Sequence, residues 1–426
     1  MMSGKMPRVT KLHQDAVDPP KFRNGGSCLG CVVMVPGIKT SYDGCARHIQ
    51  EISKRLSNKG FLVINVLATN DKEPNLQIID NSYVLLEVPS VLYHFIKPHS
   101  SLVGSYLNQF FHYSGFKEAV GKVIGDLSDR AILHTHGFCA LTQPGKSKFK
   151  RVATFQGFGQ LDMLTRDHSN IRAAVLHSAL KKVYSNADHY TVFSERMKKT
   201  ACQLYDINSR KISIVPHGVD AGFFSSRTAD GRIKELESKY AIDKPFRVIF
   251  VGTLVRGKGL EILLRAMKIL KGKRNDVMAL LKIGGFAVSS VNGLIEHYGL
   301  NGSVKAISDF LSEADFKALY QLSDAFVNFH MMTGYSTTVL EAMASGVPPI
   351  IYKNSPNSDL VDESCGLLLK SVSPKELANA IEMLADDPGL RKRLGQSAKN
   401  KAARYYDWDR SVVPRYVSLY NRLIED

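Results

Sequence analysis

The sequence predicts an α/β protein built from two doubly wound domains. Short apolar runs, each followed by a loop, an amphipathic helix and another apolar run, recur along the chain, which is the pattern of parallel strands joined by crossover helices. The 426 residues also exceed the size at which one hydrophobic core keeps growing. Two successive sets of these units therefore predict two facing domains, with a ligand in the crevice at the carboxyl ends of their strands.

The first set of units follows a polar segment. Residues 1–26 show no sustained periodicity, so we expect a mobile tail. The apolar run 29–35, which ends at Pro36-Gly37, predicts a buried parallel strand. An amphipathic helix and a second strand at 61–67 come next. Further strands of this set are predicted at 131–134, 152–155 and 189–193.

The second set of units starts with a strand at 247–252. The linker between the two sets is expected near 215–220, and the segment 376–426 is expected to be helical. The later strands of this set are predicted at 279–283, 325–329 and 348–352.

The composition limits the class of protein. A chain with 44% hydrophobic and 23% charged residues is typical of a soluble globular protein. Its longest apolar stretches fall well short of the roughly 18 residues that span a bilayer. The amino-terminal residues have no signal-like apolar core, so we expect a cytoplasmic protein. Six scattered cysteines lack a disulfide framework, which agrees with a reducing compartment.

The net charge of +16 is concentrated in the first half of the chain. Residues 1–220 hold 28 Lys and Arg against 17 Asp and Glu, whereas residues 221–426 hold 28 against 23. A basic half suggests an anionic partner, either a membrane surface or a phosphorylated substrate, and a merely solvated basic face is the alternative. Because no helix-turn-helix, zinc-finger or RNA-recognition signature is present, we expect no nucleic-acid partner.

A polar loop at 332–338 runs directly into an alanine-rich helix start that carries Glu341. In α/β folds such a junction presents backbone amides and a carboxylate to a nucleotide sugar. The segment resembles the donor-binding signature of the retaining family 4 glycosyltransferases. The resemblance implies that Glu341 accepts hydrogen bonds from the donor ribose and that the loop and helix start hold the diphosphate. The donor-binding residues it implies are Thr333, Gly334, Tyr335, Ser336, Thr337, Thr338 and Glu341.

A second glycine-containing loop, 251–259, follows a predicted strand and precedes a predicted helix. Its glycines let the backbone and cations approach a phosphate closely. The resemblance implies that Lys258 contacts the donor diphosphate. The family usually has an arginine where Thr253 stands, and Arg256 is a candidate for the missing charge. An ordinary loop with solvated cations is the alternative.

The first half carries three further matches to the family. Gly44 is the remaining member of the family's glycine pair, which lies against the donor phosphates and the acceptor pocket. His136 matches the active-site histidine, which hydrogen-bonds the transferred sugar or the acceptor. Gln156 stands where a histidine is common and can still hydrogen-bond a sugar hydroxyl. We expect His134 to be packed, and no metal ion, because no further ligand of suitable spacing is near the two histidines.

The main departure from the family pattern is Thr333. Most members carry a second glutamate there, in contact with the donor sugar. Threonine has no charge, so it cannot stabilise a developing oxocarbenium ion as a carboxylate can. The sequence therefore supports donor binding better than turnover.

The resemblance implies a GT-B fold, which consists of two facing Rossmann-like domains with a central cleft and a carboxyl-terminal helix that crosses back to the first domain. After the tail, we expect an acceptor-side domain at 27–218, a nucleotide-sugar-binding domain at 219–405, and a returning helix at 406–426.

The implied activity is retaining, metal-independent transfer of a hexosyl or N-acetylhexosaminyl unit to a cell-surface glycan or lipid-linked acceptor. The donor would be a UDP- or GDP-sugar, without a cofactor, and peripheral contact with the inner face of an anionic membrane is a further expectation. The alternatives are a non-catalytic nucleotide-sugar-binding subunit and a storage-sugar or phosphosugar glycosyltransferase. The expected catalytic residues are His136, Arg256, Lys258 and Glu341.

Overall fold

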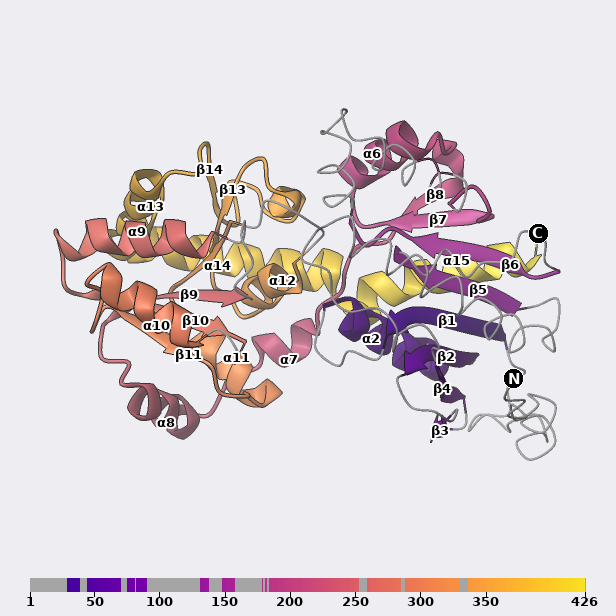
Figure 1. Ribbon diagram of the computed structural model, residues 1–426, viewed down its shortest axis with the longest axis horizontal. Helices are drawn as coiled ribbons and strands as arrows, with labels where there is room; N and C mark the ends of the chain where they lie inside the picture. The colour runs from indigo at the N-terminus through magenta and orange to yellow at the C-terminus, as the bar shows by residue number, and fades with distance from the viewer. Residues whose placement is uncertain are drawn as a thin grey trace. The chain divides into compact units, whose positions relative to one another are not determined.

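A computed structural model shows two compact units in the chain (Figure 1). Unit 1 comprises Met1–Pro216 with Val412–Asp426, and unit 2 comprises His217–Ser411. The predicted tail at 1–26 lies outside the residues that the structure describes. These residues are 29–38, 44–69, 75–80, 82–89, 131–137, 148–157, 178, 181, 184–252, 259–284, 288–329 and 336–425.

The described part of unit 1 holds an eight-stranded sheet in the order β3-β4-β2-β1-β5-β6-β7-β8. All pairs are parallel except the edge strand β3, which runs antiparallel to β4. The chain adds strands on one side of β1 and then on the other, so the switch point lies between β1 and β5. The strands are β1 (Gly30–Ile38), β2 (Phe61–Thr69), β3 (Asn75–Asp80), β4 (Tyr83–Pro89), β5 (Ala131–His136), β6 (Lys150–Thr154), β7 (His189–Val192) and β8 (Ile212–Ile214).

Strand β1 continues beyond its predicted end at Pro36-Gly37 and reaches Ile38. Its register against β2 shifts between Met34 and Gly37. Proline has no backbone N–H to donate, and an irregularity of this kind accommodates it without ending the strand. The expected stop at Pro36 is therefore wrong.

Helix α15 (Val413–Glu425) belongs to unit 1, although it follows all of unit 2 in the sequence. It packs against α2 (Gly44–Asn58) and β5. Its buried side chains recur every three or four residues, as expected for a helix with one face in a core: Val413, Tyr416, Leu419, Tyr420 and Leu423. The unit also contains α6 (Glu195–Tyr205). In the described part of the chain, no helix combines the length and apolar character needed to cross a bilayer.

The described part of unit 2 holds a six-stranded, fully parallel sheet in the order β11-β10-β9-β12-β13-β14. Counted from the first strand this order is 3-2-1-4-5-6, that of a doubly wound fold, and its switch point lies between β9 and β12. The prediction of two doubly wound α/β domains is confirmed. The strands are β9 (Phe246–Gly252), β10 (Val277–Ile283), β11 (Val304–Ile307), β12 (Ala325–Asn328), β13 (Pro349–Tyr352) and β14 (Leu367–Leu369).

Both faces of this sheet are buried. Along β9, Ile249 faces one core while its neighbours Val248 and Phe250 face the other. Strands covered on both faces read as continuous apolar runs, which is why the sequence predicts them well. Helices α9 (Leu260–Lys271), α10 (Val288–His297) and α13 (Pro374–Asp386) supply side chains to the second core.

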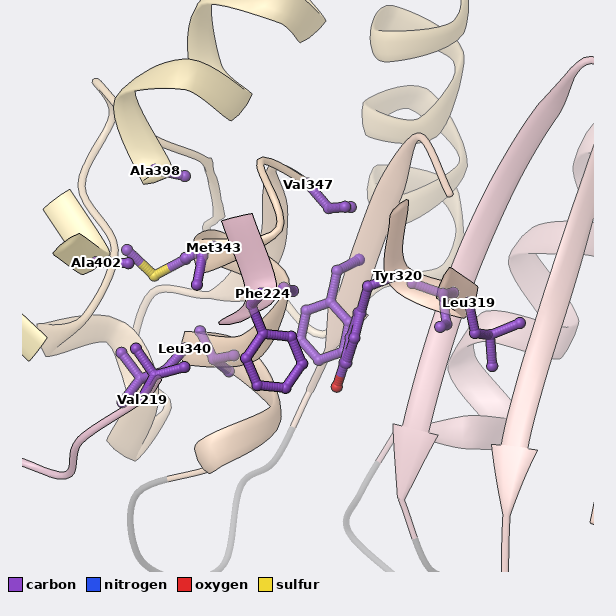
Figure 2. Close-up of a cluster of buried hydrophobic side chains, with 14 of the residues drawn as sticks. Val219, Phe224, Leu319, Tyr320, Leu340, Met343, Val347, Ala398 and Ala402 are labelled. Carbon is purple, nitrogen blue, oxygen red and sulfur yellow. The ribbon is translucent and has the colours of Figure 1, made fainter. Parts of the chain in front are cut away.

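The first core contains residues of α7 (Ala221–Ser225), α8 (Asp230–Tyr240), α11 (Glu313–Gln321), α12 (Thr337–Ala344) and α14 (Pro388–Lys401). Figure 2 shows Phe224 of α7 beside Tyr320 of α11, and their ring centroids lie 6.0 Å apart. Leu340 and Met343 bring α12 into the same cluster. Apolar contacts of its buried residues therefore help to hold helix α12 in place.

Two distant segments of unit 2 meet at Gly218. The N–H of Val219 donates to the carbonyl of Tyr406 at 2.8 Å, and the N–H of Trp408 donates to the carbonyl of Val219 at 3.1 Å. A Cβ at Gly218 would lie 2.1 Å from a carbon of the Trp408 ring, so the ring packs directly on the glycine. Because of these contacts 406–411 group with unit 2, and the observed division differs from the sequence-based boundary at 406.

Candidate functional site

In unit 2, one buried side chain ties the end of β12 to the start of α12. The N–H of Ser336, which precedes the first residue of α12, donates to Oδ1 of Asn357 at 2.7 Å. Nδ2 of Asn357 donates to Oδ1 of Asn328, the last residue of β12, at 3.2 Å. Asn357 is fully buried. The amino end of α12, with its backbone N–H groups, is thereby fixed at the switch point of the sheet.

Glu341 lies in the second turn of α12 and is only 4% exposed. Its Oε2 accepts a hydrogen bond of 2.9 Å from the hydroxyl of Tyr320. Figure 2 shows Tyr320 among the apolar side chains of the cluster, with its hydroxyl oxygen in red. A carboxylate in such surroundings is costly unless it is hydrogen-bonded, so Tyr320 accounts for part of its retention. The sequence identified Glu341 but not Tyr320.

Gly259 directly precedes α9 and adopts a left-handed conformation with φ +82°. A Cβ at this position would lie 2.3 Å from Cβ of Phe329, which follows the last residue of β12. Only glycine therefore lets the start of α9 pack this closely against the end of β12. The start of α9 thus also lies at the switch point, where its N–H groups can bind an anion.

The predicted diphosphate-binding residues Thr253, Arg256 and Lys258 lie outside the described residues, as do Thr333, Gly334 and Tyr335. The segments that flank them are described, and Gly259 and Ser336 bring both to the carboxyl ends of β9 and β12.

Lys282 is a further cation near this position. It is next to last in β10 and pairs in register with Val251 near the end of β9. Burial lowers the pKa of Lys282, against the opposing effect of the Asp309 charge, and its Nζ donates to the carbonyl of Ile283 at 3.1 Å. The sequence analysis did not identify it, because one lysine in an apolar strand carries no motif.

In unit 1, His136 ends β5 beside the switch point and is 2% exposed. Nε2 of Gln156 donates to Nδ1 of His136 at 2.9 Å. A neutral imidazole that accepts at Nδ1 carries its proton on Nε2 and can donate from there. Gln156 therefore selects the form of His136 that can donate a hydrogen bond to a sugar hydroxyl.

His48 also belongs to this cluster. It lies one turn into α2, which begins at Gly44, and its ring centroid is 6.1 Å from that of His136 in an edge-on arrangement. The ring of Phe193 also packs against that of His48, with 5.5 Å between the centroids. The structure thus brings the helix after the predicted Gly44 loop beside His136. The only sequence signal for His48 is its place one turn after that glycine.

His134 is fully buried, so the expectation that it is packed is confirmed. Its Nδ1 lies 2.6 Å from the hydroxyl of Tyr420, and its Nε2 lies 2.6 Å from Oγ1 of Thr154. Burial lowers the pKa of His134 to about 3, which keeps the ring neutral at physiological pH. Its ring packs against that of His136, with 4.2 Å between centroids.

The two clusters offer different chemistry. Unit 2 provides a buried carboxylate and helix N–H groups, which suit a sugar diol and a phosphate. Unit 1 provides an imidazole whose tautomer is selected by a neighbouring amide, which suits a hydroxyl. Within the described ranges, no group of three or more His, Cys, Asp or Glu residues could hold a metal ion.

Two family models match the chain. The model described as "Glycosyltransferase Family 4" matches residues 42–223. The model described as "Glycosyl transferases group 1" matches residues 232–401. Together they cover most of both units.

An uncharacterized glycosyltransferase of Methanocaldococcus jannaschii is 27% identical over 251 residues, which are 57% of this chain and 61% of that protein. The matched part spans about three-fifths of the length of this and the next curated relatives.

Two solved structures share the fold. Sucrose-phosphate synthase of Thermosynechococcus elongatus has a TM-score of 0.75 at 17% identity, covering 93% of this chain and 99% of that one. An Anabaena protein crystallised with UDP-glucose has a TM-score of 0.65 at 16% identity, covering 93% and 98%.

Proposed function

Because the chain belongs to the family 4 glycosyltransferases of the GT-B type, we propose that it moves a hexosyl or N-acetylhexosaminyl unit from a nucleotide-diphosphate sugar to a cell-surface glycan or glycolipid, with retention of configuration. The observation that carries the proposal is the buried Glu341 carboxylate beside an anchored helix start at the switch point of unit 2. A buried carboxylate in an apolar core is expensive for stability alone, and recognition of a donor ribose gives it a purpose.

In this proposal each of the two clusters binds a different part of the substrates. Glu341 accepts hydrogen bonds from the ribose, while Ser336, Thr337 and Thr338 at the start of α12 hold the diphosphate. Thr333, Gly334 and Tyr335 complete that loop. Gly44 and Thr253 lie against the donor phosphates.

Lys258 and Arg256 stabilise the charge that develops on the leaving diphosphate. The leaving phosphate helps to deprotonate the acceptor hydroxyl, and His136 orients the transferred sugar or the acceptor. No metal ion and no separate cofactor are required by this scheme. Thr333, which cannot supply a second negative charge, makes positioning more important than charge stabilisation on the sugar side.

The donor we propose is a UDP- or GDP-sugar. The similarity in fold to the Anabaena protein, which was crystallised with UDP-glucose, supports a UDP-sugar as the donor. Binding of UDP-, GDP- and ADP-sugars to the full chain, measured by calorimetry together with release of the nucleoside diphosphate, tests this. Glu341→Gln should weaken donor binding about 100-fold, because it loses charge-assisted hydrogen bonds.

A matched control for that experiment is Glu235→Gln, an exposed glutamate of unit 2 whose ion pair with Arg232 lies on the surface. Its donor affinity should equal that of the natural protein. Equal donor affinity in Glu341→Gln would contradict the proposal. Donor binding without release of nucleoside diphosphate, in the presence of acceptors, would favour the non-catalytic subunit.

A phosphosugar acceptor is the second candidate. The basic first half of the chain and the fold shared with sucrose-phosphate synthase favour it. A cell-surface glycolipid acceptor would place the protein in the cytoplasm with peripheral contact at the inner face of an anionic membrane. Acceptors offered as free sugar phosphates and as lipids in anionic vesicles separate the two, since transfer confined to the soluble phosphates would contradict the glycolipid proposal.

A further inference from the structure

Helix α15 reaches the histidine cluster of unit 1 through the hydroxyl of Tyr420. This hydroxyl lies 2.6 Å from Nδ1 of His134 and is fully buried. Burial holds the pKa of Tyr420 well above its usual range, so the phenol stays protonated. The residue joins two elements that are 286 positions apart in the sequence.

The other nitrogen of His134 is held equally closely. Oγ1 of Thr154 lies 2.6 Å from Nε2 of His134 and 2.5 Å from Oγ1 of Thr191 on β7. A neutral imidazole has one donor and one acceptor, and both nitrogens of His134 are therefore engaged. With a hydroxyl at each end, the ring of His134 is fixed in its plane.

The fixed ring of His134 packs against the ring of His136. The two ring planes are inclined by 31° and their centroids lie 4.2 Å apart. Tyr416, one turn before Tyr420 on α15, packs its ring 5.7 Å from His134. A rotation of the His134 ring would therefore remove a contact that restrains His136.

We propose that Tyr420 is a positioning residue for His136, which it orients by fixing the ring of His134. The proposal rests on the proposed function where it concerns transfer, because it makes α15 a part of the sugar-binding site. It does not rest on that function where it concerns the orientation of the His136 ring. The two claims can therefore be tested separately.

The test compares Tyr420→Phe with Tyr83→Phe in the full chain. Tyr83 is also a buried tyrosine of unit 1, and its hydroxyl accepts a hydrogen bond from Nδ2 of Asn65 at 2.9 Å. Tyr83 lies at the amino end of β4, whereas His136 lies at the carboxyl end of β5, and both strands belong to the parallel part of the sheet. The control thus loses a comparable hydroxyl from the same unit without touching the histidine cluster.

The first readout is the ring ¹⁵N spectrum of histidine-labelled protein, with signals assigned by their loss in His134→Gln and His136→Gln. Tyr420→Phe should move the ring signals of both histidines, whereas Tyr83→Phe should move neither. Unchanged His136 signals in folded Tyr420→Phe would overturn the proposal. If Tyr420→Phe is not recovered folded, Thr154→Val, which removes the hydroxyl from the other nitrogen of His134, should also move the His136 signals, and unchanged signals would count against the proposal.

The second readout is transfer, with the donor found in the nucleotide-sugar panel. Tyr420→Phe should lower kcat about tenfold and leave the donor KM unchanged, and this loss should vanish when His136 is already alanine. An equal loss in both backgrounds would mean a purely structural role and would overturn the proposal. If His136→Ala alone leaves transfer unchanged while Tyr420→Phe still moves the His136 signals, the positioning stands and the proposed role of His136 fails.

Discussion

At the switch point of unit 1 the end of β5 carries the imidazole of His136, whereas at that of unit 2 helix starts with their N–H groups lie beside the strand ends, together with the buried carboxylate of Glu341 on α12. In both sheets the chain adds strands first on one side of the central strand and then on the other. The switch point therefore lies between β1 and β5 in unit 1 and between β9 and β12 in unit 2. The strand order therefore determines where on the sheet a ligand can bind. The side chains at the switch point determine which part of the substrate can bind there.

The two clusters also differ in how they are supported. In unit 2, Glu341 is held by Tyr320, 21 residues earlier, and Asn357 binds Asn328, 29 residues earlier. In unit 1, His134 is held by Tyr420, 286 residues later. The carboxylate cluster is thus assembled from elements that are close together in the sequence, while the histidine cluster is completed only by a helix far along the chain.

The largest expected contrast concerns the glycines beside the two switch points. Gly137 has φ +56° and its nearest neighbours, in Gln156, would be 3.7 Å from an added Cβ, so Gly137→Ala should cost only the left-handed strain of about 1 kcal/mol. Gly259→Ala should cost about 3 kcal/mol, because the new Cβ also overlaps Phe329. Urea unfolding checks this, with fluorescence of Trp408, the single tryptophan, reporting on unit 2 and far-UV circular dichroism reporting on both units. Equal losses would show that the packing of α9 on β12 is looser than described.

A smaller contrast concerns pH. Burial lowers the pKa of His134 in unit 1 and of His217 in unit 2 to about 3. Both rings are neutral when folded and take up a proton below about pH 6.5 when unfolded, so their stabilising effect is complete above that pH and is lost as the pH falls toward 3. Between pH 6.5 and pH 5 each should reduce the free energy of unfolding by about 2 kcal/mol.

Unfolding of His134→Gln and His217→Gln at the two pH values separates these contributions. His217→Gln should flatten the pH dependence seen by Trp408 fluorescence, and His134→Gln should leave that signal as steep as in the natural protein. If His134→Gln flattens that signal as much as His217→Gln does, the two units unfold together.

The smallest contrast concerns the amide side chains. Asn357→Ala should weaken donor binding about tenfold, because the start of α12 loses its tether. Gln156→Ala should leave donor binding unchanged and lower turnover about threefold, because His136 loses selection of its tautomer. Calorimetry with donor and initial rates with acceptor measure the two effects. Weaker donor binding in Gln156→Ala would argue that the two clusters do not divide the substrate as proposed.

The sequence predicted the central strands well because continuous apolar runs such as β2 and β9 are buried on both faces. It did not predict the peripheral strands. Of these, β3 lies at an edge with Ile78 62% and Ile79 53% exposed, so it lacks the alternation of a half-buried strand. Strands β8 and β14 are three residues long, too short for any periodicity. Strands β4 and β11 were also not predicted.

The candidate site divides along the same line. Glu341 could be identified because the loop and helix that present it are contiguous in the sequence. Tyr320, His48 and Tyr420 could not, because each acts through a contact between elements that only the folded chain brings together. A single sequence holds no signal for such pairs beyond an ordinary amphipathic pattern.

The separation of His134 from Tyr420 has a consequence for synthesis of the protein. At roughly 5–20 residues per second, a ribosome that has made β5 needs roughly 14–57 seconds to reach Tyr420. Throughout that interval the strands of unit 1 lack helix α15, which packs on β5 and supplies the Tyr420 hydroxyl to His134. During the same interval all of unit 2 is made and can fold. The older half of the nascent chain is therefore the later to mature, and it is the half that chaperones would have to protect.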